Sequence, residues 1–408
     1  MKDQEESEPT SPISETTCKS IGFQRIDLVL DHPQKVYYSG NEITGKINLY
    51  LDEPVDAIGI RLKCKGEAQV YFTDRSAGIR RKFSSGENYL HEEIYIIGDR
   101  NAKNTITEGV YPFSLTLPEN LPCSFEGRYG RVRYSIRALL DITSVYRFST
   151  NIIPFTVAPT LDLNRDSLAP LPVSEKQSKV YMGQTESLNM SMSLPVRGYV
   201  PGQTIPIQIL LKNYSNVIMY HATEKSRKHK EIVVEIEQPI DKNCESYDIV
   251  FDVPAVPPTG MIHCNIIDVL YTLKAEACVD VSEWYYRMFQ KNLKLRTNVI
   301  VGTIPLRNYE DPQNTLSMPL NTFSPNVITT SEASYLNENE ISTKEIGETN
   351  QSEVILPVYE KSQIYRSSKP DRDDPTGDDG DSDGEVKPYS PVYRVYKFKS
   401  STKRKDAN

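Results

Sequence analysis

The sequence has little of what would assign it a chemistry. Its 408 residues include a single tryptophan, six cysteines and five histidines. The cysteines form no CxxC pair and match no zinc spacing, and the histidines are scattered with no Ser/His/Asp or Cys/His arrangement around them. A Gly-rich phosphate loop is missing as well. We therefore expect no catalytic residues, no cofactor and no metal site, and predict that the protein is not an enzyme.

Long apolar runs are missing too. No stretch of the sequence approaches the ~18 apolar residues that a membrane-spanning helix needs. The first residues, MKDQEESEPTSPISETT, hold no apolar core of the kind that a secretory signal carries. Unpaired cysteines are typical of proteins in a reducing compartment. Together these absences predict a cytoplasmic protein.

Charge is spread unevenly along the chain, whose formal net charge is -8. Residues 1–20 carry five acidic and two basic side chains, and residues 309–408 carry 18 acidic and 12 basic ones. The remaining body is therefore close to neutral. A dedicated nucleic-acid binder needs a strongly basic face, so we expect no nucleic-acid partner.

Apolar residues at every second position dominate the body of the sequence. Such runs occupy residues 43–51, 58–64, 111–117, 132–138, 205–211, 232–236, 247–253 and 267–277. This alternation is typical of strands with one buried face, and turn residues such as Gly40-Asn41 separate the runs. Many short strands without helical spacing between them predict an all-β fold of stacked sheets.

Polar segments divide the chain into five parts. Residues 1–20 are rich in Ser, Thr and Pro, and we predict that they are disordered. Residues 21–158 and 181–308 each form one predicted β-sandwich, and residues 159–180, with three prolines, form the linker between them. Residues 309–408 hold too few apolar side chains to offset chain entropy, which predicts a disordered tail.

Several stretches resemble the arrestin-domain family, and within it the α-arrestins. Glu108–Arg137 reads EGVYPFSLTLPENLPCSFEGRYGRVRYSIR and is similar to the family's N-domain signature. Arg197–Asn213, RGYVPGQTIPIQILLKN, resembles the start of the C-domain, and residues 257–275 and 295–306 resemble its later strands. The resemblance covers roughly Phe23–Leu306. It implies two tandem immunoglobulin-like β-sandwiches, the arrestin N- and C-domains.

The resemblance also implies a function. The α-arrestins generally act as adaptors that connect membrane cargo, such as receptors or transporters, to HECT-class ubiquitin ligases. The ligases' WW domains bind PPxY motifs in the adaptor's tail. By this resemblance the protein promotes ubiquitination, endocytosis and transport of its cargo, peripherally associated with the plasma membrane and endosomes. The alternative is a ubiquitin-independent trafficking scaffold that resembles the arrestin-fold subunits of endosomal coats.

The tail contains two degenerate versions of the PPxY motif and no complete one. LPVY at 356–359 and SPVY at 390–393 keep the second proline and the tyrosine. Without the first proline, the polyproline backbone that a WW domain grips is less pre-organised, and leucine retains an apolar contact that serine loses. We predict WW-binding residues, weakened and better at the first motif, at Leu356, Pro357, Tyr359, Ser390, Pro391 and Tyr393. The alternative is that these are ordinary tail residues, phosphorylation sites or sorting signals.

Two charged blocks lie within the tail. Asp371–Glu385 holds eight carboxylates, and its DGDSDG stretch mimics the start of a calcium loop. The twelfth position of that loop would be Ser390 and not a glutamate, so we expect a solvated acidic tract. The basic segment Arg394–Lys405 predicts a weak contact with anionic lipid.

Overall fold

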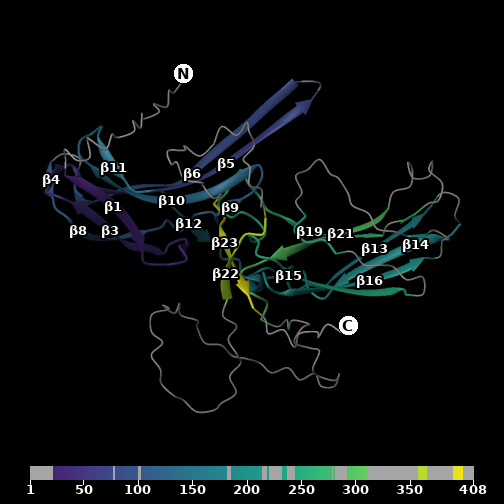
Figure 1. Ribbon diagram of the computed structural model, residues 1–408. Helices are drawn as coiled ribbons and strands as arrows, with labels where there is room; N and C mark the ends of the chain where they lie inside the picture. Colours follow the sequence, from purple (N-terminus) through teal and green to yellow (C-terminus); the bar gives the residue numbers. More distant parts are fainter. Residues whose placement is uncertain are drawn as a thin grey trace, which may run out of the picture.

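The computed structural model describes residues 22–76, 79–99, 103–181, 185–213, 218–219, 232–236, 244–277, 279–280, 292–307, 309, 357–364 and 389–397. Two β-sandwiches lie side by side, and a short hairpin from the tail lies between them (Figure 1). The prediction of an all-β fold with two tandem sandwiches is confirmed. No helical segment within the described residues is long and apolar enough to cross a bilayer.

The first sandwich contains one three-stranded sheet, in the order β1-β3-β8, and one larger sheet, in the order β2-β12-β10-β5-β6. Strands β9 and β11 also pair with β10, and β4 pairs with β7. The bounds are β1 Phe23–Leu30, β2 Val36–Tyr38, β3 Glu42–Leu51, β4 Val55–Ala57, β5 Gly59–Ser76, β6 Ile79–Gly98, β7 Asn104–Ile106, β8 Gly109–Thr116, β9 Phe125–Glu126, β10 Gly130–Asp141, β11 Arg147–Ser149 and β12 Ile153–Ala158.

The second sandwich contains a four-stranded sheet, in the order β13-β14-β16-β18, and a three-stranded sheet, in the order β15-β21-β19. Strands β17 and β20 form a separate pair, as do the tail strands β22 and β23. The bounds are β13 Val173–Val180, β14 Ser187–Leu194, β15 Gly198–Tyr199, β16 Thr204–Asn213, β17 Ile218–Met219, β18 Ser246–Asp252, β19 Tyr271–Ala277, β20 Val279–Asp280, β21 Leu293–Val301, β22 Pro357–Lys361 and β23 Val392–Tyr396. A 3-10 helix, Leu163–Arg165, precedes β13.

The alternation seen in the sequence corresponds to real burial. In β3, Ile43, Ile47 and Leu49 face the core and are almost fully buried. Gly45 occupies the core-facing position between them, because a side chain there would overlap the backbone of β1 and the ring of Phe113. Each core therefore follows from period-two burial on facing sheets, as the sequence predicted.

The two sandwiches are joined by more than the linker. The segment between β18 and β19 leaves the second sandwich, and its Met261 and Val269 are buried in the core of the first. The Cys123 Sγ atom lies 3.4 Å from the Met261 Sδ atom, and the backbone N–H of Asn265 donates to Glu87 at 3.2 Å. A shared core of this kind fixes the orientation of one sandwich against the other.

Three expectations from the sequence differ from the structure. The predicted strand at 232–236 is wrong: these residues make no ladder with another described strand, and Ile232, Val234 and Ile236 are exposed. The predicted linker contains β13, which pairs with β14 and belongs to the second sandwich. The third difference is in the tail, where β22 and β23 form strands at positions predicted to be disordered. The predicted disordered segment 1–20 lies outside the described residues.

A substitution in the first core tests the predicted packing. Ile47→Ala should lower the free energy of unfolding by about 2–5 kcal/mol, because it removes a fully buried side chain and leaves a cavity. Lys46→Ala, its exposed neighbour on β3, is the control and should change stability by less than about 0.5 kcal/mol. Chemical denaturation measures both. Equal effects would contradict the assigned inward and outward faces.

Candidate functional site

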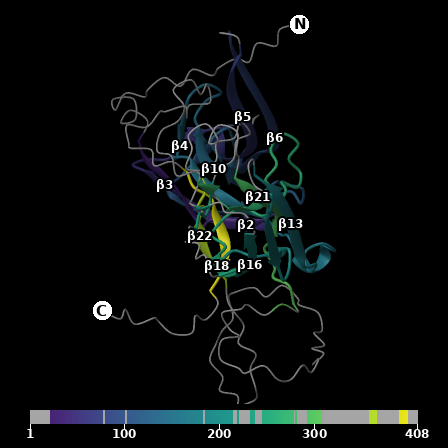
Figure 2. The same ribbon diagram turned by 90° about the vertical axis from the view of Figure 1, so that its right-hand side faces the viewer.

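The tail hairpin, residues 357–364 and 389–397, holds the two predicted motifs together. Strand β22 pairs antiparallel with β23 and sets Tyr359 opposite Arg394 and Glu360 opposite Tyr393. Figure 1 shows the hairpin between the sandwiches, and Figure 2 shows it at right angles, in a view where the sandwiches overlap. An isolated two-stranded hairpin is marginally stable in water, so its contacts with the body decide whether it forms.

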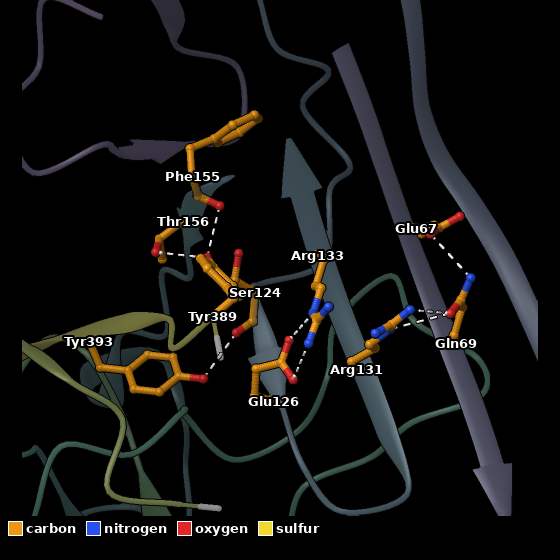
Figure 3. Close-up of polar contacts among 10 residues, drawn as sticks. All are labelled: Glu67, Gln69, Ser124, Glu126, Arg131, Arg133, Phe155, Thr156, Tyr389 and Tyr393. Atoms are coloured by element: carbon orange, nitrogen blue, oxygen red, sulfur yellow. Dashed lines mark hydrogen bonds and ion pairs between the residues drawn. The ribbon is translucent and has the colours of Figure 1, made fainter. Parts of the chain in front are cut away.

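Tyrosines of the hairpin contact the first sandwich through their hydroxyl groups (Figure 3). The Tyr393 hydroxyl donates to the backbone carbonyl of Ser124 at 3.0 Å. The Tyr389 hydroxyl donates to the Phe155 carbonyl at 2.9 Å and lies 3.1 Å from the Thr156 hydroxyl. Both contacts reach the segment before β9 or the strand β12 through side-chain hydroxyls, and β22 and β23 remain a separate two-stranded sheet.

Other groups of the hairpin contact the second sandwich. The Tyr396 hydroxyl donates to the Thr303 carbonyl at 2.8 Å, and the Tyr396 backbone N–H donates to the Pro201 carbonyl at 2.9 Å. The Gln363 backbone N–H donates to the Ala255 carbonyl at 2.7 Å. The hairpin therefore bridges the two sandwiches. We call the body residues that receive it the tail-docking site: Tyr38, Ser124, Phe155, Thr156, Pro201, Gly202, Ala255 and Thr303.

The structure places the predicted WW-binding residues in this hairpin. Pro357 and Tyr359 lie on β22 and are half-buried, and the Tyr359 hydroxyl is 2.8 Å from the Tyr38 hydroxyl. Ser390 is half-buried. Pro391 is buried, and Tyr393 is only 3% exposed. Leu356 lies outside the described residues. The two motifs therefore lie in one hairpin. The first motif, which is the better predicted WW ligand, has the more accessible tyrosine.

Gly202 shapes the docking site. Its φ of 87° lies in the left-handed region, and a Cβ atom built there would overlap the Tyr396 carbonyl group. The turn at Pro201-Gly202 therefore serves two purposes: it reverses the chain before β16, and it lets β23 approach the backbone. The Gly202 N–H donates to the Val253 carbonyl at 2.7 Å, which holds the turn.

Burial raises the pKa of the docked tyrosines. It raises the pKa of Tyr393 well above the ordinary value, and the pKa values of Tyr389 and Tyr396 in the same direction. The protonated hydroxyl is the form that can donate to the backbone carbonyls named above. Ionisation would leave a buried charge beside carbonyl oxygens, so the hairpin selects neutral tyrosine.

A buried ion pair lies beside the docked hairpin (Figure 3). Glu126 is 5% exposed and accepts from the Arg133 guanidinium, with one contact at 3.2 Å. Burial raises the pKa of Glu126, while Arg133 and Arg131 act in the opposite direction. Arg131 donates to Gln69 at 2.9 and 3.2 Å. Arg131 and Arg133, which alternate along β10, therefore have partners on neighbouring strands of the same sheet.

No set of three or more His, Cys, Asp or Glu side chains gathers as a metal site among the described residues. What the sequence analysis missed is the docking of the tail. A signal was present: Pro391, Tyr393 and Val395 are buried at every second position, and they lie in YSPVYRVY, an apolar run within a polar tail. Period-two spacing in a tail predicts a strand as it does in the body.

Gly202→Ala tests the docking geometry. The added methyl group should displace β23, so trypsin should cleave after Arg394 at least about tenfold faster, because cleavage tracks the population of the undocked hairpin. Gly260→Ala is the matched control, since Gly260 also has a positive φ, of 78°, and nothing lies within 4 Å of its Cβ position. Equal cleavage rates in the two variants would contradict the close approach.

The buried tyrosines predict an alkaline limit. Their folded pKa lies above the unfolded value of about 10, so their stabilising effect is complete below that pH and is lost as pH rises beyond it. Tyr393→Phe should lower stability by about 1 kcal/mol at neutral pH through the lost hydrogen bond. Above about pH 10 it should make the decline shallower by about 1.4 kcal/mol per pH unit. Denaturant titrations at increasing pH measure this, and an unchanged slope would contradict the buried hydroxyl.

Comparison with known proteins identifies both sandwiches. Residues 26–164 match the family model described as "Arrestin (or S-antigen), N-terminal domain". Residues 184–306 match "Arrestin (or S-antigen), C-terminal domain". The tail hairpin lies beyond both matched regions, whereas the body residues that receive it lie within them.

Several relatives have the arrestin domain in their names. Arrestin domain-containing protein 17 of Caenorhabditis elegans is 26% identical over 323 residues, which cover 70% of this chain and 72% of the relative. Arrestin domain-containing protein 4 of Mus musculus is 26% identical, covering 71% and 73%. Arrestin domain-containing protein 1 of Rattus norvegicus is 25% identical, covering 62% of this chain and 60% of the relative. With both domains matched in order, the chain belongs to the arrestin-domain-containing family.

Proposed function

We propose that the protein is an arrestin-type adaptor that links a membrane receptor or transporter to a HECT-class ubiquitin ligase through its tail. On this proposal it promotes ubiquitination, endocytosis and transport of the cargo from the cytoplasmic face of the plasma membrane and endosomes. The family supports the adaptor role, which rests on binding surfaces and requires no catalytic group. The single observation that carries the ligase step is the pairing of both degenerate motifs in one hairpin.

The hairpin makes ligase binding conditional on its release. A WW domain inserts the tyrosine of its ligand into an aromatic-lined pocket, which a side chain 3% exposed cannot enter. Tyr393 therefore becomes available only when β23 leaves the tail-docking site. Tyr359 is half-buried and is the first to become accessible. The apparent affinity for a WW domain is then the intrinsic affinity reduced by the fraction of undocked hairpin.

Undocking also decides whether the two motifs act together. In the docked state β22 and β23 are hydrogen-bonded to each other, so a WW domain meets a strand and not a polyproline helix. After release, the chain between Tyr359 and Tyr393 spans roughly 30–35 Å on average if it behaves as a flexible coil. That span lets tandem WW domains bind both weak motifs and gain avidity.

A substitution that undocks the hairpin without changing the motifs tests this proposal. Tyr396→Ala removes a docking contact while leaving both motifs intact, so capture of the full chain by a purified tandem WW fragment should rise about tenfold to a hundredfold. Tyr359→Ala combined with Tyr393→Ala should abolish capture. Equal capture of all three chains would remove the WW claim and leave the adaptor role.

The second candidate is a ubiquitin-independent trafficking scaffold. One observation favours it: the tyrosines of the degenerate motifs have a structural use, since the hydroxyl groups of both contact the first sandwich. On this alternative, partners dock on the sandwiches and the tail contributes only to stability. A chain without residues 309–408 should then reach endosomes as the full chain does, whereas the ligase proposal expects cargo ubiquitination to be lost.

A further inference from the structure

The tail hairpin places an arginine directly opposite Tyr359. In the register of β22 and β23, Arg394 is the residue that faces Tyr359 across the strand pair. Directly opposed residues project from the same face of two paired strands, with Cβ atoms about 4.5–5.5 Å apart. Both side chains are half-buried, so each still reaches solvent. A group added to the Tyr359 hydroxyl would therefore lie within reach of the flexible Arg394 side chain.

Arg394 lacks the partners that a half-buried guanidinium usually has. Its Nε atom is buried without a hydrogen-bond partner, and no ion pair joins Arg394 to a carboxylate within the described part of the chain. Its guanidinium carbon lies 5.5 Å from the centroid of the Tyr396 ring. By contrast, the Arg61 Nε atom in the first sandwich lies 2.8 Å from the Asp141 carboxylate. The N–H donors of Arg394 are therefore available to an anion.

The surroundings of Tyr359 can accept a phosphate on its hydroxyl. The Tyr359 hydroxyl lies 2.8 Å from the Tyr38 hydroxyl, and Tyr38 is itself half-buried. The Tyr38 hydroxyl can donate to a phosphate oxygen. A phosphotyrosine carries a charge of about −1.5 to −2 at pH 7 and three strong acceptor oxygens. Opposite an unpaired arginine, such a group forms new charge-assisted hydrogen bonds that hold two segments together.

Tyr393, in the second motif, lies where a phosphate is excluded. Its side chain is 3% exposed, and its hydroxyl donates to the Ser124 carbonyl, which can accept a hydrogen bond and cannot donate one. Burial above all, and also the nearby carboxylate of Glu126, raises the pKa of the Tyr393 hydroxyl, so negative charge is disfavoured there. The docked hairpin is therefore compatible with a phosphate on Tyr359 and incompatible with one on Tyr393.

We propose that Tyr359 is a phosphorylation site for a tyrosine kinase, and that its phosphate pairs with Arg394 and holds the hairpin in the tail-docking site. In the reaction, the Tyr359 oxygen forms a bond to the γ-phosphorus of ATP. The bond from that phosphorus to the bridging oxygen breaks, and ADP leaves with the bonding electrons. The hydroxyl proton passes to the catalytic base of the kinase.

The effect of this modification on ligase binding rests on the ligase proposal, which it deepens. A phosphorylated, docked hairpin keeps Tyr393 buried. The phosphate also adds bulk and charge to Tyr359, the side chain that a WW domain would take into its aromatic pocket. Phosphorylation should therefore oppose capture by the ligase at both motifs. The pairing of the phosphate with Arg394 stands independently, because it is measured without a WW domain.

Hydrogen exchange of the full chain before and after phosphorylation tests the pairing. A purified tyrosine kinase domain with ATP supplies the modification, and mass spectrometry of the peptides should find Tyr359 modified faster than Tyr393. The Tyr396 amide, which donates to the Pro201 carbonyl, should then exchange at least about tenfold more slowly, because charge-assisted hydrogen bonds stabilise the docked hairpin. Arg394→Gln should abolish that slowing.

Lys397→Gln is the matched control. Lys397 is an exposed cation directly after β23, and its Nζ atom lies 3.9 Å from Glu360. This variant should show the same slowing on phosphorylation as the wild-type chain, within about twofold.

Three results would overturn the proposal: faster exchange of the Tyr396 amide after modification, equal slowing in Arg394→Gln, or modification of Tyr393 in preference to Tyr359. A slowing that depends on Arg394, found in a chain that a tandem WW fragment does not capture in any form, would support the pairing and contradict only the ligase proposal.

Discussion

The organising constraint in this protein is the need of buried tyrosine hydroxyls for backbone acceptors. Tyr393 and Tyr396 bury their rings at places where a backbone carbonyl oxygen accepts from each hydroxyl. Ser124 of the first sandwich supplies one carbonyl and Thr303 of the second supplies the other. The strand β23 therefore fits only where both sandwiches hold their observed orientation. Docking of the tail therefore depends on the orientation of the sandwiches, and the docked tail in turn stabilises that orientation.

The short tail hairpin therefore contributes to holding the two sandwiches in their observed orientation. Leaving a buried donor unpaired costs about 1–3 kcal/mol, so moving one sandwich away from the other is opposed at several hydroxyl groups together. These hydrogen bonds hold the sandwiches together in addition to the apolar contacts of Met261 and Val269 in the first core. Losing the hairpin leaves the linker and the segment between β18 and β19 as connections between the sandwiches. An adaptor built this way couples the accessibility of its tail motifs to the arrangement of its body.

Much of the fold was predictable because it depends on local alternation. Ile43, Ile47 and Leu49 in β3 read as strand positions from spacing alone, and the family resemblance supplied the pairing of sheets that spacing cannot give. The failures have physical causes. The run at 232–236 alternates, yet its side chains are exposed, since periodicity says nothing about whether a partner strand exists. The sequence of β13 predicts a linker because its segment is polar and contains prolines, and in the structure only Val173 of its residues is buried.

The tail shows the limit of reasoning from composition. Averaged over residues 309–408, polarity predicts disorder, and the average hides two short segments rich in Tyr, Val and Pro. Proline and tyrosine are the residue types that a WW domain binds. The same residue types also pack well in a protein interior, so the predicted WW ligands can dock on the body. Docking on the body depends on the carbonyl groups of Ser124 and Thr303, which are far from the tail in the sequence.

Backbone hydrogen exchange of the intact wild-type chain tests the central claim most directly. If the hairpin is docked across both sandwiches, the amide of Tyr396, which donates to the Pro201 carbonyl, should exchange orders of magnitude more slowly than in an unstructured peptide. Its protection should approach that of amides in β12. Exchange at the rate of a free peptide would show that the tail does not occupy the docking site, and the account would fail.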